Sequence, residues 1–220
     1  VLEHHDRSRF EVYAFDNGWD DSSETRRRIE AAVHALVGIR HLGDERAVAA
    51  IRERQIDILV NLNGYFGEGR TNVFARRAAP IQVNYLGFPG TMGATYMDYI
   101  VADRRVIPEA DRSCYEEKVV YLPNCYQAND RKRRVAETVF DRAMLGLPED
   151  GFVFCCFNNN YKIMPAMFDC WVRILRRVPN GVLWLLEDNS EAKANLCREA
   201  AARGLDPARI VFAGRMPVAD

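Results

Sequence analysis

The sequence has little net charge and no long apolar segment. Its 30 basic and 31 acidic residues leave a formal net charge of −1, so no overall positive field would attract nucleic acid or an anionic membrane. No apolar run approaches the roughly 20 residues that span a bilayer, and the first residues lack the apolar stretch of a signal peptide. We therefore expect neither nucleic acid nor a membrane among the partners of this protein.

Residue types that bind metals or act as nucleophiles are few and unfavourably spaced. None of the six cysteines belongs to a C-x-x-C pair, and the four histidines have no metal-ligand spacing. The sequence contains no H-E-x-x-H motif and no recognisable catalytic triad. This pattern predicts reduced, mostly buried thiols in a cytoplasmic protein, rather than a zinc site or a disulfide framework.

Short apolar runs alternate with amphipathic segments along most of the chain. Such an alternation predicts an α/β fold with parallel sheets covered by helices on both faces. Helices are expected over residues 24–37, from an N-cap at Asp44, over 165–177 and over 191–203. Strands are expected over residues 10–15, 56–60, 81–86, 99–102, 118–122, 152–157, 182–186 and 210–213.

A polar segment rich in Pro, Asp and Arg divides this alternation. It lies between residues 123 and 150, and a short helix is expected near Val139. We predict one Rossmann-like lobe over residues 1–125, a connection over 126–150 and a second lobe over 151–220. Each lobe has too few strand–helix pairs for a complete doubly wound domain, so we expect both to be truncated. The basic run 131–134 is interpreted as a solvated loop or helix start.

Three loops that follow predicted strands are candidates for ligand binding, because ligands of open α/β sheets lie beyond the carboxyl ends of the strands. The first, 61–70, contains three glycines, but this pattern alone favours a structural turn over a ligand-binding loop. The second, 86–93, has three glycines and a proline. Its spacing matches neither a dinucleotide fingerprint nor a P-loop, but its exposed amides could hold a sugar or a phosphate.

The third loop, 158–164, leads into a helix that opens at Pro165. The free amides and positive dipole of a helix N-terminus suit a diphosphate. Lys162 adds a cation, and a transferase that breaks a sugar–diphosphate bond must stabilise charge on the departing phosphate. An exposed lysine without function at a helix start is the alternative.

At these loops the chain resembles the O-linked N-acetylglucosamine transferase family, including its bacterial members and the plant SPINDLY proteins. The matching segments follow one another in the family order over nearly the whole chain. They are 57–65 (DILVNLNGY), 79–91 (APIQVNYLGFPGT), 97–100 (MDYI), 157–165 (FNNNYKIMP), 171–180 (WVRILRRVPN) and 182–186 (VLWLL).

The resemblance implies a GT-B glycosyltransferase with two Rossmann-like lobes that needs neither a metal nor another cofactor. It also implies inverting transfer of N-acetylglucosamine from UDP-GlcNAc to Ser or Thr of intracellular proteins. Lys162 matches the family lysine that stabilises the leaving diphosphate. Further substrate-binding positions implied by the family are Leu86, Gly87, Phe88, Pro89 and Gly90 for the sugar, together with Asn159, Tyr161 and Arg70.

Two departures and several missing segments bear on activity. Phe66 replaces the Thr that commonly follows the family's G-Y pair, and Asn159 stands where animal members carry a longer Gln. An upstream Asp and His, the downstream H-T-T segment and the TPR repeats of the family are not in this sequence, so we expect the 220 residues alone to be inactive. Alternatives are a related transferase with another sugar donor or acceptor, a GT-B-like epimerase, and a non-catalytic binding or scaffold module.

Overall fold

The chain divides into two compact units, Val1–Asn129 and Asp130–Asp220, in a computed structural model that describes residues 1–133 and 135–216. Arg134, the last residue of the basic run, and residues 217–220 of the predicted second lobe lie outside the described residues. The predicted domain ranges themselves stay predictions. Each unit is described by itself below.

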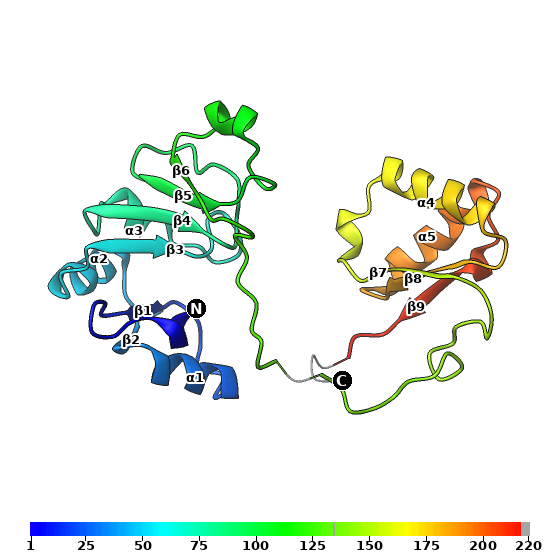
Figure 1. Ribbon diagram of the computed structural model, residues 1–220, viewed down its shortest axis with the longest axis horizontal. Helices are drawn as coiled ribbons and strands as arrows, with labels where there is room; N and C mark the ends of the chain where they lie inside the picture. The colour runs from blue at the N-terminus through cyan, green and yellow to red at the C-terminus, as the bar shows by residue number, and fades with distance from the viewer. Residues whose placement is uncertain (134, 217–220) are drawn as a thin grey trace. The chain divides into compact units, whose positions relative to one another are not determined.

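The first unit contains a two-stranded and a four-stranded sheet, and every strand pair in them is parallel (Figure 1). The strand orders are β1-β2 and β3-β4-β5-β6. The strands are β1 (Tyr13–Asp16), β2 (Ala35–Gly38), β3 (Ile58–Asn61), β4 (Ile81–Tyr85), β5 (Tyr99–Ala102) and β6 (Lys118–Tyr121). The helices are α1 (Glu24–Ala32), α2 (Asp44–Glu53) and α3 (Thr71–Ala75), with 3-10 turns η1 (Leu2–His4) and η2 (Glu109–Cys114).

The predicted helix over 24–37 is too long. Helix α1 ends at Ala32, and Ala35–Gly38 form strand β2, whose residues pair in parallel with β1. The His34 amide donates to the carbonyl of Val12 at 2.7 Å, so the chain is already bound to the neighbouring strand there. Pairing with a distant segment overrides local helix periodicity. Asp44 is likewise the first helical residue of α2 and not its cap, which is Gly43.

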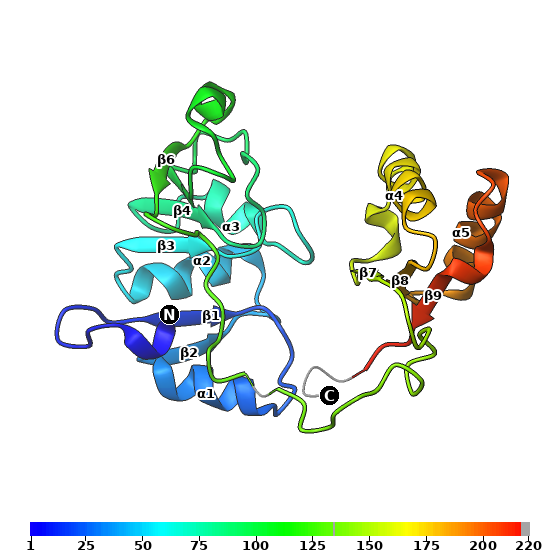
Figure 2. The same cartoon turned by 45° about the vertical axis from the view of Figure 1, so that its right-hand side comes forward.

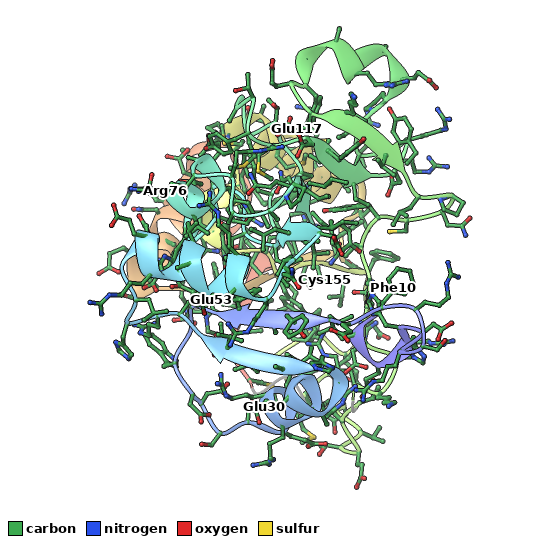
Figure 3. All side chains as sticks on the ribbon, turned by 90° about the vertical axis from the view of Figure 1, so that its left-hand side faces the viewer. Phe10, Glu30, Glu53, Arg76, Glu117 and Cys155 are labelled. Atoms are coloured by element: carbon green, nitrogen blue, oxygen red, sulfur yellow. The ribbon has the colours of Figure 1, made fainter. Side chains whose placement is uncertain are left out.

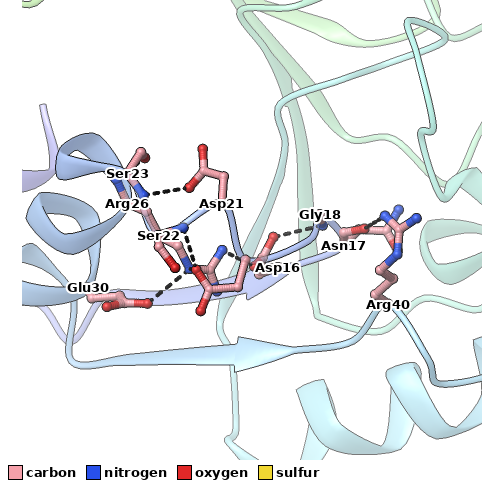
Figure 4. A network of polar contacts seen from close by, with 10 residues as sticks. Asp16, Asn17, Gly18, Asp21, Ser22, Ser23, Arg26, Glu30 and Arg40 are labelled. Carbon is pink, nitrogen blue, oxygen red and sulfur yellow. Dashed lines mark hydrogen bonds and ion pairs between the residues drawn. The ribbon is translucent and has the colours of Figure 1, made fainter.

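A polar network ties α1 to the end of β1 (Figure 4). The hydroxyl of Ser23 accepts a hydrogen bond from the amide of Arg26 at the start of the helix. The Arg26 guanidinium forms ion pairs with Asp16 at 2.7 Å and with Glu30 at 3.2 Å. Partial burial raises the pKa of Asp16, but the hydrogen bond from Arg26 and other favourable interactions together outweigh this effect, and the pKa is lowered overall. The network fixes the helix against the carboxyl end of the first strand.

The core of the first unit lies on one face of the four-stranded sheet. Helix α2 contributes Ala47, Val48 and Ile51 to it, and α3 contributes Val73 and Phe74. The opposite face carries exposed apolar residues, namely Ile58, Val60, Ile81 and Val120. For the four-stranded sheet, the prediction that helices cover both faces is therefore wrong, because α2 and α3 pack into the same cluster on one face.

Gln82 links the helical layer to the sheet from a fully buried position in β4. Its Nε2 donates to the carbonyls of Phe74 at 2.8 Å and Tyr96 at 2.7 Å, and its Oε1 accepts the amide of Ala78 at 3.1 Å. Its own amide donates to Asp98 at 2.7 Å. Every polar atom of this buried side chain is satisfied, as buried amides require.

The second unit has one parallel sheet in the order β7-β8-β9. Helices α4 and α5 lie on the same side of it in Figures 1 and 2 and contribute to one core around Leu183 and Leu185. The elements are β7 (Val153–Cys156), η3 (Asn160–Lys162), α4 (Pro165–Arg177), β8 (Val182–Leu186), α5 (Ser190–Ala202), η4 (Pro207–Arg209) and β9 (Ile210–Ala213).

Three predictions for this unit and its connection are wrong. Strand β7 is not fully buried, since the flanking Phe152 and Phe157 are 59% and 49% exposed. Cys155, labelled in Figure 3, is exposed, and none of the six free thiols is buried. The described residues near Val139 form no helix, and its side chain is 91% exposed. In each case a local apolar pattern lacks a second layer to pack against.

Asp103, directly after β5, anchors the chain where it leaves the sheet. Its carboxylate accepts the amides of Tyr126 at 2.8 Å, Arg105 at 2.9 Å and Val106 at 3.0 Å. The Tyr85 hydroxyl donates to the Tyr126 carbonyl at 2.7 Å. The amide hydrogen bonds, that of Tyr126 first, hold the pKa of Asp103 below its ordinary value.

This lowered pKa predicts a pH dependence of stability. The ionised carboxylate stabilises the folded state above its ordinary pKa of about 3.9, and the contribution is lost as the pH falls through the lower folded pKa. We expect the urea midpoint of the wild-type chain to fall more steeply than that of Asp103→Asn between about pH 5 and 3. Parallel curves would contradict the role of the charge.

Candidate active site

Two loops at the carboxyl ends of the neighbouring strands β3 and β4 lie in direct contact. The amide of Gly87 donates to the carbonyl of Leu62 at 3.1 Å. A Cβ atom at Gly87 would overlap that carbonyl oxygen, and one at Gly64 would lie 2.5 Å from the Cβ of Phe88. The two loops can approach this closely only because glycine has no side chain.

Side chains of the first loop fix its own turn and reach into the second. The Asn61 Oδ1 accepts the amides of Asn63 and Gly64 at 3.0 Å each. The Tyr65 ring lies edge-on to Phe88 with centroids 5.7 Å apart, and its hydroxyl donates to the carbonyl of Met92 at 2.7 Å. The loops 61–70 and 86–93, predicted separately, therefore form one structure, which we call the paired loops.

Several carbonyls of the second loop accept hydrogen bonds from side chains, whereas three of its amides are free within the described residues. Asn84 Nδ2 donates to the carbonyls of Phe88 at 3.0 Å and Gly90 at 3.3 Å. The amides of Phe88, Gly90 and Thr91 have no hydrogen-bond partner among the described residues. Leu86, at the start of the loop, has a φ of 78°, a conformation that costs a non-glycine residue free energy and is common at functional sites. The loop thus presents donors suited to the oxygens of a sugar or phosphate.

Two residues after η2 complete this support, and the sequence analysis missed both. Glu117, labelled in Figure 3, is buried and accepts the Thr91 hydroxyl at 2.7 Å and the Met92 amide at 2.6 Å. The Tyr115 hydroxyl donates to the carbonyl of Pro89 at 3.0 Å. No motif marks these positions, because their role comes from the adjacency of β5 and β6 to the loop.

Arg70 uses its guanidinium inside the first unit. It forms an ion pair with Asp44 at 2.6 Å and donates to the carbonyls of Ile39 and Leu42 at 2.9 Å each. The hydrogen bond from Arg70 is the main cause that lowers the pKa of Asp44. Arg70 thereby connects the first loop to the segment between β2 and α2. Its predicted contact with substrate stays a prediction.

In the second unit, the N-terminus of α4 differs from those of α1 and α5. Ser23 caps α1 and Asn189 caps α5 through side-chain hydrogen bonds. The N-cap of α4 is Met164, which has no such bond, and the first turn of α4 contains no acidic residue. Its amides and dipole are therefore available to an anion.

Lys162 lies at the end of η3, two residues before this helix cap. Its side chain is exposed, and its ammonium lies 5.9 Å from the centre of the Tyr161 ring. Among the described residues it has no ion-pair partner. The position suits a cation that meets a ligand at the helix N-terminus.

The loops after β7, β8 and β9 converge on Arg215. Its guanidinium donates to Asn159 Oδ1 at 3.3 Å and forms an ion pair with Asp188 at 2.5 Å. Asn160 Nδ2 donates to the carbonyl of Leu186 at 3.1 Å. Arg215 was not among the predicted site residues, although its place after the predicted strand 210–213 was a usable signal.

The predicted site residues thus fall into two groups. The structure brings Leu86, Gly87, Phe88, Pro89 and Gly90 together with the first loop. Asn159, Tyr161 and Lys162 gather before α4 in the second unit, and each assignment to a ligand stays a prediction. The described residues contain no group of three or more His, Cys, Asp or Glu placed to hold a metal ion. No described helix has the length and apolar character needed to cross a membrane.

Parallel sheets with loop clusters at the carboxyl ends of their strands define an α/β fold of the GT-B glycosyltransferase type. The chain matches a mutant of the O-GlcNAc transferase of Thermobaculum terrenum with a TM-score of 0.87 and 30% sequence identity, over 100% of this chain and 41% of that one. The predicted fold class is confirmed.

The chain belongs to glycosyl transferase family 41, whose model matches residues 1–139 and 134–219. It is 41% identical over 218 residues to the probable UDP-N-acetylglucosamine–peptide N-acetylglucosaminyltransferase SEC of Arabidopsis thaliana, covering 96% of this chain and 22% of that protein. The SPINDLY protein of the same plant is 31% identical over 83% of this chain and 20% of its own length. The chain therefore spans about a fifth of these relatives, and the predicted family resemblance is confirmed.

The contact between the paired loops predicts the effect of Gly87→Ala. The added Cβ would meet the Leu62 carbonyl, so the second loop must shift and the unfolding free energy should fall by about 1–3 kcal/mol. Urea denaturation would measure this. Gly38→Ala is the matched control in the same unit, since nothing lies within 4 Å of a Cβ there. Equal stabilities of the two variants would contradict the proposed contact.

Proposed function

We propose that this chain belongs to the catalytic region of an inverting glycosyltransferase that moves N-acetylglucosamine from UDP-GlcNAc to Ser or Thr of proteins. The relatives named above as UDP-N-acetylglucosamine–peptide N-acetylglucosaminyltransferases support this donor and acceptor. The observation that carries the proposal is the uncapped N-terminus of α4 with Lys162 beside it. This arrangement fits the diphosphate of a sugar nucleotide.

The two groups of donors have different tasks in this mechanism. The α4 N-terminus and the Lys162 ammonium bind the diphosphate, and the amides of Phe88, Gly90 and Thr91 bind sugar oxygens. The acceptor hydroxyl oxygen attacks the anomeric carbon on the side opposite UDP and forms the new glycosidic bond. The bond to the diphosphate oxygen breaks, UDP leaves with the electron pair, and the acceptor hydroxyl loses its proton to a general base.

Charge on the leaving group decides the rate of this step. The departing diphosphate gains negative charge as the bond breaks, so a fixed cation and free helix amides stabilise the transition state more than the bound donor. Lys162 has no competing carboxylate among the described residues. In this proposal it does the work that a metal ion does in other transferases, and no further cofactor takes part.

A related transferase with another sugar donor or acceptor is the main alternative, because donor contacts reside in loops that can change within one fold. A non-catalytic binding module is the other. Upstream TPR repeats that recruit protein acceptors, and the cytoplasmic location, stay predictions. Competition between different UDP-sugars would separate the alternatives.

The deciding experiment compares wild type and Lys162→Met in the intact parent chain, with labelled UDP-GlcNAc and a protein acceptor. We expect kcat to fall by about 10²- to 10³-fold, since removal of one such donor costs this much, while folding and donor binding are largely kept. Arg173→Met is the control, because Arg173 is an exposed residue in the middle of α4 and its loss removes the same charge from the same helix.

Each outcome has a definite meaning. Transfer that survives Lys162→Met would remove Lys162 from the mechanism but keep the transferase. Transfer by the wild type from another UDP-sugar alone would replace the proposed donor. An intact wild-type chain that transfers no sugar would favour the binding module.

A further inference from the structure

Two buried side-chain atoms beneath the paired loops have no hydrogen-bond partner among the described residues. They are Nδ2 of Asn61 and Oδ1 of Asn84. Asn61 is 5% exposed and Asn84 is fully buried. An unsatisfied buried polar atom costs about 1–3 kcal/mol, so two of them at one place call for an explanation.

The two atoms are complementary and near each other. Asn61 is the register partner of Asn84 in the parallel pairing of β3 and β4. Paired residues of adjacent strands lie about 5 Å apart and project from the same face of the sheet. One orphan atom is a donor and the other is an acceptor, so each lacks what the other offers.

The remaining contacts determine the orientation of both amide groups. Asn61 Oδ1 accepts two backbone amides, those of Asn63 and Gly64. Asn84 Nδ2 donates to two carbonyls, those of Phe88 and Gly90. Rotating either amide by 180° would set donor against donor or acceptor against acceptor. The orphan donor of Asn61 and the orphan acceptor of Asn84 are therefore correctly assigned.

We propose that Asn61 and Asn84 form a positioning pair in which one buried water accepts a hydrogen bond from Nδ2 of Asn61 and donates one to Oδ1 of Asn84. The pair completes a continuous path of hydrogen bonds. It runs from the Gly64 amide through both side chains to the carbonyls of Phe88 and Gly90. Each side chain is hydrogen-bonded to the backbone of one loop. The pair therefore sets how the two loops lie relative to one another.

The consequence for function rests on the proposed transferase activity. The amides of Phe88, Gly90 and Thr91 are free to bind the donor sugar, and Asn84 holds the carbonyls of the same short loop. Loss of the pair lets the second loop shift and misdirects these amides. The pair touches no substrate, and its effect should therefore appear in donor KM and leave the chemical step nearly unchanged.

The first test is a double-mutant cycle in the intact parent chain. Asn61→Ser keeps an oxygen that can accept the loop amides but removes the amide donor, and its shorter side chain no longer reaches the water. We expect donor KM to rise about tenfold, the equivalent of one hydrogen bond, with kcat within about twofold of wild type. In an Asn84→Ala background the same change should alter KM by less than about twofold, because its partner is already gone.

Asn195→Ser is the matched control, since Asn195 is an exposed residue of α5 and the same substitution there should leave KM unaltered. Equal effects of Asn61→Ser in both backgrounds would overturn the pair. A fall in kcat without a change in KM would also overturn it, because it would place Asn61 in the chemistry.

A second measurement keeps the proposal testable if Asn61→Ser does not fold or the wild type transfers no sugar. A high-resolution crystal structure of the wild-type catalytic region should show Nδ2 of Asn61 and Oδ1 of Asn84 both within about 3.2 Å of one water. Separate partners for the two atoms would refute the pair. Absence of transfer together with an intact pair would refute only the proposed function.

Discussion

The close approach of two backbone segments, Leu62 and Gly87, is the constraint on which the first unit's site depends. The Gly87 amide donates to the Leu62 carbonyl at 3.1 Å, and no side chain fits between them. Parallel pairing of β3 and β4 brings both loops to one edge of the sheet. A parallel sheet alone would leave these loops adjacent but independent. The Gly87–Leu62 hydrogen bond and the contact between Tyr65 and Phe88 join them into one surface.

On that surface, backbone carbonyls are hydrogen-bonded to side chains, and several backbone amides are free of partners among the described residues. Side chains of Asn84, Tyr115 and Tyr65 occupy carbonyl oxygens of the second loop. The free amides are left for a ligand. Since these donors belong to the backbone, they carry no net charge and suit the uncharged oxygens of a ligand. The buried supporting groups keep them oriented before a ligand arrives, which lowers the cost of binding.

The donors of the second unit differ from those of the first because they carry positive charge. A diphosphate carries charge, and the unit offers an uncapped helix and a lysine free of ion pairs among the described residues. Arg215, by contrast, already pairs with Asp188 and holds Asn159. One cation thus remains available while the other organises the loops after β7, β8 and β9. The two units therefore present chemically distinct donors, which are backbone amides in the first unit and a helix N-terminus with a lysine in the second.

The sequence by itself determined the α/β class, the alternation of elements and the loops that carry chemistry. Strands β5, β8 and β9 and helix α4 have the predicted bounds, because their apolar periodicity and flanking Pro or Gly are local properties. Family motifs pointed to Lys162 and to the second loop, because motifs are also local properties of the sequence. Residues 35–38, predicted as helix, form a strand because they pair with β1. This pairing is non-local, so only the tertiary structure reveals it. The tertiary structure alone selected Glu117 and placed Asn61 opposite Asn84, because burial and partners are set by residues distant in the chain.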